Sequence, residues 1–419
     1  MEEKIERAVL VGLNADIFSA EETASWESLD ELAALLETAG GECICKILQS
    51  RPAPDARTFL GEGKCKELCE TAQNFDADLI LFDNELSPSQ MRTIEEMSGR
   101  TVLDRSALIL DIFAQRARTG EGKLQVELAQ YQYLLPRLSG MGHALSRLGG
   151  GIGTRGPGES KLETDRRHIR RRIDRLRAEL EDVRRVRAVQ RRRRKKAEMP
   201  LVAIVGYTNA GKSTLLNTLT GAGIEANDRL FDTLDPTTRK LRISETQEIL
   251  LSDTVGFIRK LPHHLVSAFK ATLEELSYAD LLLHVVDVSA ENWEEQAKTV
   301  QKVIEELGAA QIPQILVCNK ADQCENMDLI PSGAECVSIS AKYGRGMDEL
   351  LAAIERGLGR GKHHITLLIP YAEGALTERL FRECKVHRSE YNETGTLMEI
   401  TCDDMIYGQM KAYEVAQDG

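Results

Sequence analysis

The chain has 419 residues, of which 42% are hydrophobic and 29% are charged. This length predicts about two to four domains with cores of their own, and no apolar run reaches the roughly 18 residues of a membrane-spanning helix. The start of the chain, MEEKIERAVLVGL, is too acidic, and its apolar stretch too short, for a signal peptide. We therefore expect a cytoplasmic protein without a membrane span. We also expect a monomer.

The formal charge of −12 is distributed very unevenly along the chain. Residues 166–196 hold 16 Lys or Arg against 4 Asp or Glu, a net charge of +12, so the rest of the chain carries −24. An asymmetry of this size predicts one element that contacts a polyanion, on an otherwise acidic protein.

Residues 1–118 alternate short apolar runs with helical patterns. The runs AVLVGL at 8–13, CICKIL at 43–48 and DLILFD at 78–83 are separated by stretches such as SLDELAALLETAG and GKCKELCETAQNF. This alternation is typical of a small α/β domain.

Residues 119–198 predict an antiparallel helical hairpin. Apolar residues recur at heptad-like spacing in two stretches, and they are Leu124, Leu128, Tyr131, Leu135 and Leu138, then Ile169, Ile173, Leu176, Leu180 and Val183. Two such helices bury their apolar seams against each other. The loop between them, at 139–158, contains eight glycines, which excludes regular structure over most of its length.

Arginines of this hairpin are candidate RNA contacts. Arg170, Arg177, Arg184 and Arg191 lie seven residues apart, so they follow one side of the second helix. A row of arginines on a rigid rod fits a phosphate backbone, and Arg155 in the glycine loop is placed for a phosphate or base contact at the tip. The alternative is a solvated basic helix that only balances the acidic remainder.

Residues 199–358 predict a doubly wound α/β domain, because strand-like runs such as LVAIVG, EILLSD, LLLHVVDV and QILVCNK alternate with helical patterns. Residues 359–419 predict a small α+β domain, in which HITLLIP and TLMEITC flank the helical ALTERLFREC. The expected protein is therefore of the α/β class, with four parts.

The segment GYTNAGKS at 206–213 has the pattern of a phosphate-binding loop, because it follows the strand-like LVAIV and precedes a helix-forming stretch. Backbone N–H groups and the helix N-terminus are expected to hold the phosphates. Lys212 would neutralise β- and γ-phosphate oxygens, and Ser213 would bind Mg²⁺. The residues assigned to this loop are Gly206, Tyr207, Thr208, Asn209, Ala210, Gly211, Lys212, Ser213 and Thr214.

Two further segments, NKAD and SAK, predict that the base is guanine. Asp322 follows the strand-like QILVC and would accept hydrogen bonds from the N1–H and the exocyclic amine of guanine. Adenine lacks this pair of donors, and a buried carboxylate left unpaired is unfavourable, so the site would bind GTP and GDP and reject ATP. The residues assigned to the base pocket are Asn319, Lys320, Ala321, Asp322, Ser340, Ala341 and Lys342.

The segment DTVG at 253–256 ends the strand-like EILLS. Asp253 would hold a Mg²⁺-bound water, and the Gly256 N–H would sense the γ-phosphate. The next residue, Phe257, stands where many GTPases have a glutamine that orients the attacking water. A phenyl ring cannot orient water, so we expect slow intrinsic hydrolysis that relies on phosphate and metal electrostatics, or on groups supplied by a partner. A Phe257 that only packs is compatible with the same expectation.

The other switch is predicted at 231–235, with the Thr233 hydroxyl as the second Mg²⁺ ligand, while Thr237 and Thr238 are alternatives. Lys212, Thr233 and Gly256 are then the candidate catalytic groups. The residues assigned to the two switches are Phe231, Asp232, Thr233, Leu234, Asp235, Asp253, Thr254, Val255 and Gly256.

Four longer segments are not general features of GTPases: DRSALILDIFAQRARTGEGKLQVELAQ, GGGIGTRGPGES, FDTLDPTTR and DTVGFIRKLPHHLVSAFKATLEE. Together they closely resemble the HflX family of translational GTPases, over residues 1 to about 360. The resemblance implies binding to the ribosome, chiefly the large subunit and its rRNA, ribosome-stimulated GTP hydrolysis, and the splitting or rescue of stalled or stressed ribosomes. It also implies Mg²⁺ ligation by Ser213 and Thr233, whereas Asp232 and Gly120 depart from the family pattern.

Two other functions fit the same residues. In the first, the N-terminal domain and the basic hairpin bind rRNA constitutively, or assist maturation of the large subunit, and GTP hydrolysis sets their release. In the second, the protein is a GTPase that helps to modify transfer RNA. The second is less supported, because the sequence shows no separate catalytic constellation.

Overall fold

The computed structural model of the chain describes residues 5–19, 22–138, 157–196, 199–221, 230–231, 237–243, 247–260, 276–324, 335–359 and 362–415. The chain divides into two compact units, residues 1–351 and 352–419. The architecture is α/β, as predicted. Within the described ranges, no helix is both long and apolar enough to cross a membrane.

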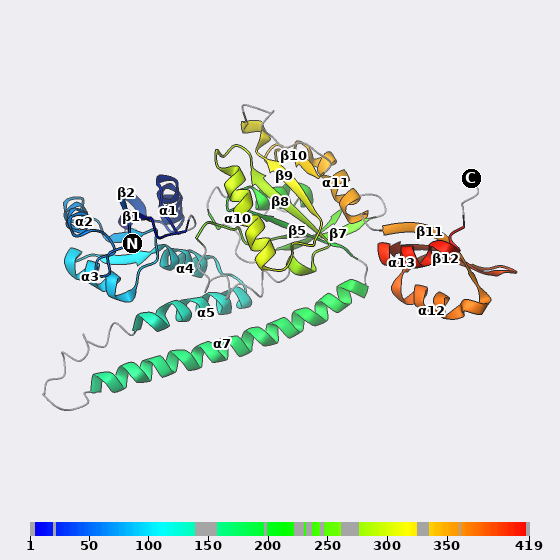
Figure 1. Cartoon of the computed structure of the whole chain (residues 1–419), viewed down its shortest axis with the longest axis horizontal. Helices are drawn as coiled ribbons and strands as arrows, with labels where there is room; N and C mark the ends of the chain where they lie inside the picture. Colours follow the sequence, from blue (N-terminus) through cyan, green and yellow to red (C-terminus); the bar gives the residue numbers. More distant parts are fainter. Residues whose placement is uncertain are drawn as a thin grey trace. The chain divides into compact units, whose positions relative to one another are not determined.

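The N-terminal α/β domain is built on four parallel strands in the order β2-β1-β3-β4 (Figure 1). Its elements are β1 (Arg7–Ala15), α1 (Trp26–Thr38), β2 (Glu42–Arg51), α2 (Glu62–Asn74), β3 (Leu79–Phe82), α3 (Pro88–Ser98), β4 (Thr101–Asp104) and α4 (Arg105–Arg116). The three predicted apolar runs form β1, β2 and β3. Strand β4 was not predicted, because it is short and only two of its four residues, Val102 and Leu103, are apolar, whereas all four residues of β3 are.

Helices α5 (Gly120–Arg137) and α7 (Pro157–Lys196) form the predicted hairpin and lie side by side in Figure 1. The buried seam consists of Leu128, Ile173, Leu176 and Leu180, with Leu124, Tyr131, Leu135 and Ile169 packed against it. Helix α7 begins inside the predicted loop 139–158, because a proline fits the first helical position. The long basic helix is therefore held by an apolar contact, and its charges are not needed for its folding.

Two ion pairs show that the hairpin is antiparallel. Arg172 lies 2.7 Å from Glu127, and Arg187 lies 2.6 Å from Glu121. Later residues of α7 thus pair with earlier residues of α5.

The predicted doubly wound domain contains a six-stranded sheet in the order β10-β9-β8-β5-β7-β6, in which only the β6–β7 pairing of the described strands is antiparallel. Its elements are β5 (Leu201–Gly206), α8 (Lys212–Thr220), β6 (Thr238–Arg242), β7 (Glu248–Asp253), β8 (Leu281–Asp287), α10 (Trp293–Glu306), β9 (Gln314–Asn319), β10 (Cys336–Ser338) and α11 (Met347–Gly359). Parallel strands end at one edge of a sheet. The loops after β5, β7 and β9 therefore lie at the same edge.

The second unit contains a small α+β domain, as predicted. Strands β11 (Lys362–Pro370), β12 (Lys385–Tyr391) and β13 (Gly395–Asp403) form an antiparallel sheet in the order β11-β13-β12. Helices α12 (Gly374–Glu383) and α13 (Asp404–Met410) complete it, and the domain has a hydrophobic core of its own that includes Leu367, Leu380 and Ile400.

A buried histidine in β8 is expected to make the doubly wound domain sensitive to acid. His284 of β8 is buried, and no hydrogen-bond partner for its Nε2 occurs among the described residues. Burial lowers the pKa of His284 to about 4. Since the unfolded chain binds this proton at about pH 6.5, the contribution of neutral His284 to stability is complete above pH 6.5 and is lost as the pH falls towards 4.

Replacement of His284 with leucine is therefore expected to protect the domain from acid. Relative to the wild type, the His284→Leu variant should gain about 2 to 3 kcal/mol of unfolding free energy between pH 7 and pH 4.5. Denaturant unfolding at both pH values, following the transition that added GDP shifts, measures this difference. The same replacement at the exposed His168 of α7 is the control, and an equal gain there would contradict the assignment.

Candidate nucleotide site

The loop between β5 and α8 packs so tightly against β8 and β9 that its terminal glycines cannot be replaced. A Cβ on Gly206 would lie 2.3 Å from the carbonyl oxygen of Val285. Gly211 has a φ of +90°, and a Cβ there would lie 2.2 Å from Nδ2 of Asn319. Only glycine fits such contacts, so the two glycines of the GxxxxGKS pattern fix the course of the loop.

The Lys212 side chain is buried inside this loop. Its Nζ donates a hydrogen bond of 2.7 Å to the carbonyl oxygen of Tyr207. Burial lowers the pKa of Lys212 to about 8, against the attraction of Asp253. A Cβ added to Gly256 would lie 3.0 Å from this Nζ, so two of the three candidate catalytic groups meet. Polyphosphate next to Lys212 would stabilise the ammonium form.

Two of the predicted magnesium donors are also neighbours. The Ser213 hydroxyl donates a hydrogen bond of 2.8 Å to the Asp253 carboxylate, which is buried. The Thr254 hydroxyl donates a hydrogen bond of 2.7 Å to the carbonyl oxygen of Ile204. This bond anchors the start of the DTVG segment on β5. Hydroxyl and carboxylate oxygens suit Mg²⁺, and P-loop GTPases in general use this ion. Thr233 lies outside the described residues.

The remaining oxygen ligands of such an ion would come from phosphate and water. In the part of the chain that the structure describes, no group of three or more His, Cys, Asp or Glu side chains could hold a metal. The hydroxyl of Ser213 and the carboxylate of Asp253 suit Mg²⁺, which usually keeps several waters and binds substrate phosphates. Of the alternatives to Thr233, the Thr238 hydroxyl already has a hydrogen-bond partner, because it lies 3.1 Å from the hydroxyl of Ser252.

Asn319 joins three segments of the site. Its Nδ2 donates a hydrogen bond of 2.8 Å to the carbonyl oxygen of Ala210, and its Oδ1 accepts one of 3.0 Å from the Ala341 N–H. The Thr218 hydroxyl of α8 donates 2.8 Å to the Ala341 carbonyl oxygen. Asn319 is only 2% exposed, so it fixes the phosphate loop, the NKAD segment and the SAK segment relative to one another. The sequence predicted it only as a base-pocket residue.

The rim of the base pocket is more open. Asp322 and Lys342 are exposed, whereas Ala341 is buried. Lys320 has a φ of +59°, and its Nζ lies 2.7 Å from the Asp287 carboxylate at the end of β8. This ion pair holds the NKAD turn, and it leaves the Asp322 carboxylate accessible to a base.

Three family models match consecutive parts of the chain. "GTP-binding GTPase N-terminal" matches residues 26–114, "GTP-binding GTPase Middle Region" matches 116–194, and "50S ribosome-binding GTPase" matches 201–320. GTPase HflX of Caldanaerobacter subterraneus subsp. tengcongensis is 50% identical over 401 residues, 95% of this chain and 92% of the relative. GTPase HflX of Escherichia coli K12 is 46% identical over 377 residues, 88% of each chain.

The chain belongs to the HflX family of GTPases. The predicted resemblance is confirmed, and so is the predicted enzyme class, a GTPase that hydrolyses GTP. Among solved structures, a GTP-binding protein of Sulfolobus solfataricus in complex with GDP is 24% identical, with a TM-score of 0.44, and the match covers 85% of this chain and 99% of that chain.

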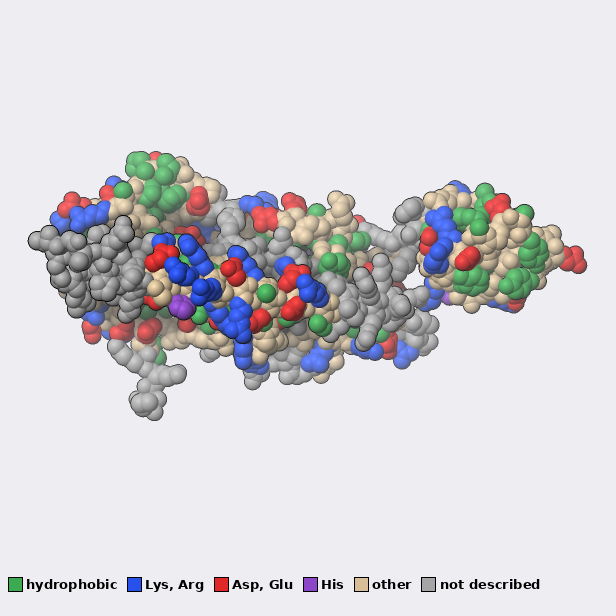
Figure 2. All heavy atoms as spheres, turned by 90° about the horizontal axis from the view of Figure 1, so that it is seen from below, with side chains coloured by type: hydrophobic (Ala, Val, Ile, Leu, Met, Phe, Trp, Pro, Cys, Tyr) green, Lys and Arg blue, Asp and Glu red, His purple; other side chains and the backbone are tan. Residues whose placement is uncertain are grey.

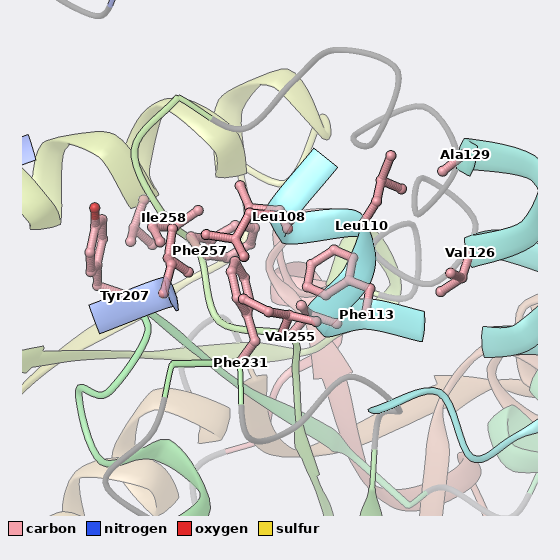
Figure 3. Close-up of a cluster of buried hydrophobic side chains, with 14 of the residues drawn as sticks. Leu108, Leu110, Phe113, Val126, Ala129, Tyr207, Phe231, Val255, Phe257 and Ile258 are labelled. Carbon is pink, nitrogen blue, oxygen red and sulfur yellow. The ribbon is translucent and has the colours of Figure 1, made fainter. Parts of the chain in front are cut away.

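In this HflX-family chain, the N-terminal domain packs directly on the switch segments. Figure 3 shows Leu108 and Phe113 of α4 beside Phe231, Val255 and Phe257 of the GTPase domain. The rings of Phe113 and Phe231 meet edge to face, with centroids 4.7 Å apart. Phe231 and Phe257 are each only 2% exposed. Their side chains therefore belong to the core, and a nucleotide contact by Phe231 would have to come from its backbone.

A charged cluster beside this core joins the two domains. Arg105 of α4 is buried and donates to Asp83 at 2.8 Å, to Glu31, and to the carbonyl oxygen of Arg259 at 3.2 Å. Lys260, which has a φ of +55°, forms an ion pair with the same Asp83. The segment after DTVGF is thus held at the carboxyl end of β3. Open α/β sheets commonly bind ligands at that end of their strands.

Backbone contacts also join the phosphate loop to the DTVGF segment. The Thr208 N–H donates a hydrogen bond of 2.7 Å to the Phe257 carbonyl oxygen. The Phe257 N–H donates one of 3.1 Å to the Gly206 carbonyl oxygen. The Tyr207 hydroxyl accepts a hydrogen bond of 2.7 Å from the Arg259 N–H and donates one to Glu31. Phosphate loop, switch and N-terminal domain form one connected unit.

The arginines predicted to contact RNA differ in their surroundings. Arg170 is exposed, Arg177 is exposed and lies 3.9 Å from Asp174, and Arg184 is half-buried and lies 3.4 Å from Glu181. Arg155 and the side chain of Arg191 lie outside the described residues.

Three exposed arginines in the N-terminal half of α7 have no ion pair among the described residues. Arg167, Arg170 and Arg171 are exposed and make no hydrogen bond or ion pair with any residue that the structure describes. Further along, Arg175, Arg177 and Arg185 pair with acids of the same helix. Figure 2 shows Lys and Arg side chains along α7, with Asp and Glu among them. Among the described side chains of α7, the unpaired arginines therefore lie in the N-terminal half of the helix.

Proposed function

We propose that this GTPase binds the large ribosomal subunit in its GTP-bound state and helps to split or rescue stalled or stressed ribosomes. The observation that carries the proposal is the continuous core between the switches and the hairpin. Phe231 and Phe257 of the switch segments, Phe113 of α4, and Val126 and Ala129 of α5 belong to one buried cluster. A change at either switch would therefore act on the base of the hairpin.

In this proposal the nucleotide site has a conventional division of roles. Lys212 and the Gly256 N–H would contact the γ-phosphate, and Ser213, Thr233 and, through water, Asp253 would hold Mg²⁺. Asp322 recognises guanine by accepting its hydrogen bonds, within a pocket that Asn319 and the SAK segment hold in place. Mg²⁺, when bound, supplies positive charge to the phosphate oxygens.

The hairpin is the proposed rRNA contact. It is supported by the unpaired arginines in the N-terminal half of α7 and by the apolar seam, which folds the hairpin without using those charges. The guanidinium group of arginine is planar and pre-organised, so it binds phosphates with a small loss of side-chain conformational entropy per hydrogen bond. The family model that matches residues 201–320 is described as a "50S ribosome-binding GTPase", which agrees with a large-subunit partner.

Nucleotide-dependent binding to large subunits tests the proposal. Sedimentation with purified subunits should show binding about 5- to 150-fold tighter with a non-hydrolysable GTP analogue than with GDP, which is the usual range of coupling between two sites. Equal binding with the analogue, with GDP and without nucleotide would contradict the switch. It would support the alternative of a constitutive rRNA-binding or maturation factor.

Reversing the charge of Arg167, Arg170 and Arg171 to glutamate is expected to weaken large-subunit binding about 10- to 100-fold. The loss of three phosphate contacts should also make the dependence of log K on log salt shallower by about 2 to 3. The affinity for GDP should not change, because the three residues lie on α7, and none of the residues assigned to the nucleotide site lies on that helix.

The matched control reverses Arg175, Arg177 and Arg185, which lie on the same helix and pair with its own acids. The net charge changes equally in the two variants. If the control weakens binding as much as the test variant, binding depends on overall charge and the local contact is wrong. If neither variant weakens it, the RNA site lies elsewhere.

A further inference from the structure

One hydroxyl in the phosphate loop lacks a partner. Thr208 is only 5% exposed, and its Oγ1 is buried and accepts or donates no hydrogen bond among the described residues. Its backbone N–H is engaged, because it donates a hydrogen bond of 2.7 Å to the Phe257 carbonyl oxygen. Buried hydroxyls nearly always have a partner, so an unpaired one inside a ligand site indicates a group that the ligand completes.

The side chain of Thr208 lies beside the position where the γ-phosphate is expected. A Cβ built on Gly256 would be 2.8 Å from the Thr208 methyl carbon and 3.0 Å from Nζ of Lys212. The methyl group and the ammonium therefore flank the same small space next to Gly256. Lys212 and the Gly256 N–H are the groups assigned to the γ-phosphate. Thr208 thus borders the position of the terminal phosphate from the side of the phosphate loop.

A single rotamer step brings the hydroxyl to this position. Threonine side chains occupy staggered wells about 120° apart. Rotation of χ1 by one well moves the Thr208 oxygen to a place near that which the methyl carbon now occupies, without moving the backbone. The backbone contact with Phe257 can therefore stay intact while the hydroxyl turns to the ligand.

The neighbouring residue cannot supply this group. Phe257 follows Gly256, is buried in the core with Phe113 and Phe231, and carries no hydrogen-bonding side chain. Hydrolysis still requires that a water be held in line with the bond to be broken. A polar side chain on the opposite wall of the site would meet this requirement.

We propose that the Thr208 hydroxyl orients the attacking water, by accepting a hydrogen bond from it while donating one to a γ-phosphate oxygen. In this step the water oxygen bonds to the γ-phosphorus and the bond from that phosphorus to the β–γ bridging oxygen breaks. The water proton passes to the released phosphate, so Thr208 holds the water and takes up no proton. The inference rests on the GTPase activity of the family and is independent of the ribosomal partner.

The test compares two variants of the full-length protein without ribosomes. Thr208→Val keeps the shape and removes the hydroxyl, whereas Thr208→Ser keeps the hydroxyl and removes the methyl group. Single-turnover hydrolysis of GTP should slow about 100-fold in the valine variant, the usual effect of losing one transition-state hydrogen bond. In the serine variant it should stay within about threefold of the wild type.

The affinity for GDP, which lacks the γ-phosphate, is measured in parallel and should change less than about threefold in both variants, since the altered contact involves the γ-phosphate alone. Wild-type hydrolysis rates in the valine variant would overturn the proposal. Equal slowing in both variants would also overturn it, because it would show that packing and not the hydroxyl matters. The same holds if GDP affinity falls together with the rate. Loss of ribosome binding would leave these measurements unaffected.

Discussion

Replacement of Asp322 with asparagine is expected to weaken GTP and GDP binding by about 10²- to 10⁴-fold. Two hydrogen bonds from guanine to a charged carboxylate are altered, and such bonds contribute about 1.5 to 3 kcal/mol each. Xanthine has a carbonyl oxygen where guanine has its exocyclic amine. An amide N–H at position 322 can donate to that oxygen, so xanthosine nucleotides should bind the variant better than they bind the wild type.

Competition against a fluorescent GDP analogue, with GTP, xanthosine triphosphate and ATP, measures this change of selectivity. The replacement of Asp76 with asparagine is the control, because it removes an exposed carboxylate of the N-terminal domain, where it pairs with Arg100. Displacement of GDP from the wild type by ATP at concentrations comparable to GTP would show that Asp322 does not read the base.

The base pocket also shows which features of the site can be predicted from sequence motifs. The NKAD and SAK segments follow β9 and β10, and the structure brings them to the edge of the sheet that carries the phosphate loop. Each motif consists of consecutive residues after an apolar strand, so a single sequence shows it. Asn319 as a bridge between Ala210 and Ala341 was not predicted, because its partners are 109 and 22 residues away.

The hairpin was predicted for a different reason. Its apolar residues repeat with heptad spacing over several turns, and this periodicity is a strong signal of helices that pack on each other. Which of its arginines lack an ion pair could not be predicted. Whether an arginine pairs with an acid of its own helix depends on side-chain conformation, and the sequence alone did not distinguish Arg170 from Arg177.

The contact between the N-terminal domain and the switches had no signal in the sequence. Arg105 meets the backbone of Arg259, 154 residues away, and Lys260 meets Asp83, 177 residues away. Such pairs have no local motif, and their members look like ordinary surface charges when read one by one. The structure brings them into one cluster, because the N-terminal domain and the GTPase domain pack against each other there.

The large ribosomal subunit is expected to accelerate single-turnover GTP hydrolysis by about 10³- to 10⁵-fold, which is the effect of stabilising groups supplied in trans to other GTPases. Phe257 is buried, and its backbone is paired with Gly206 and Thr208. It therefore offers no hydrogen bond to water. A Thr208 hydroxyl would hold the water but would add no positive charge to the transition state, so the intrinsic reaction should remain slow.

Hydrolysis measured with excess protein, with and without saturating large subunits, tests this expectation. In the variant with Arg167, Arg170 and Arg171 reversed, stimulation at limiting subunit concentration should fall in proportion to the loss of binding, while the intrinsic rate stays unchanged. The variant reversed at Arg175, Arg177 and Arg185 should be stimulated like the wild type. Equal rates with and without subunits would mean that binding supplies no catalytic group. Full stimulation of the first variant would mean that the ribosome activates the switches without the hairpin contact.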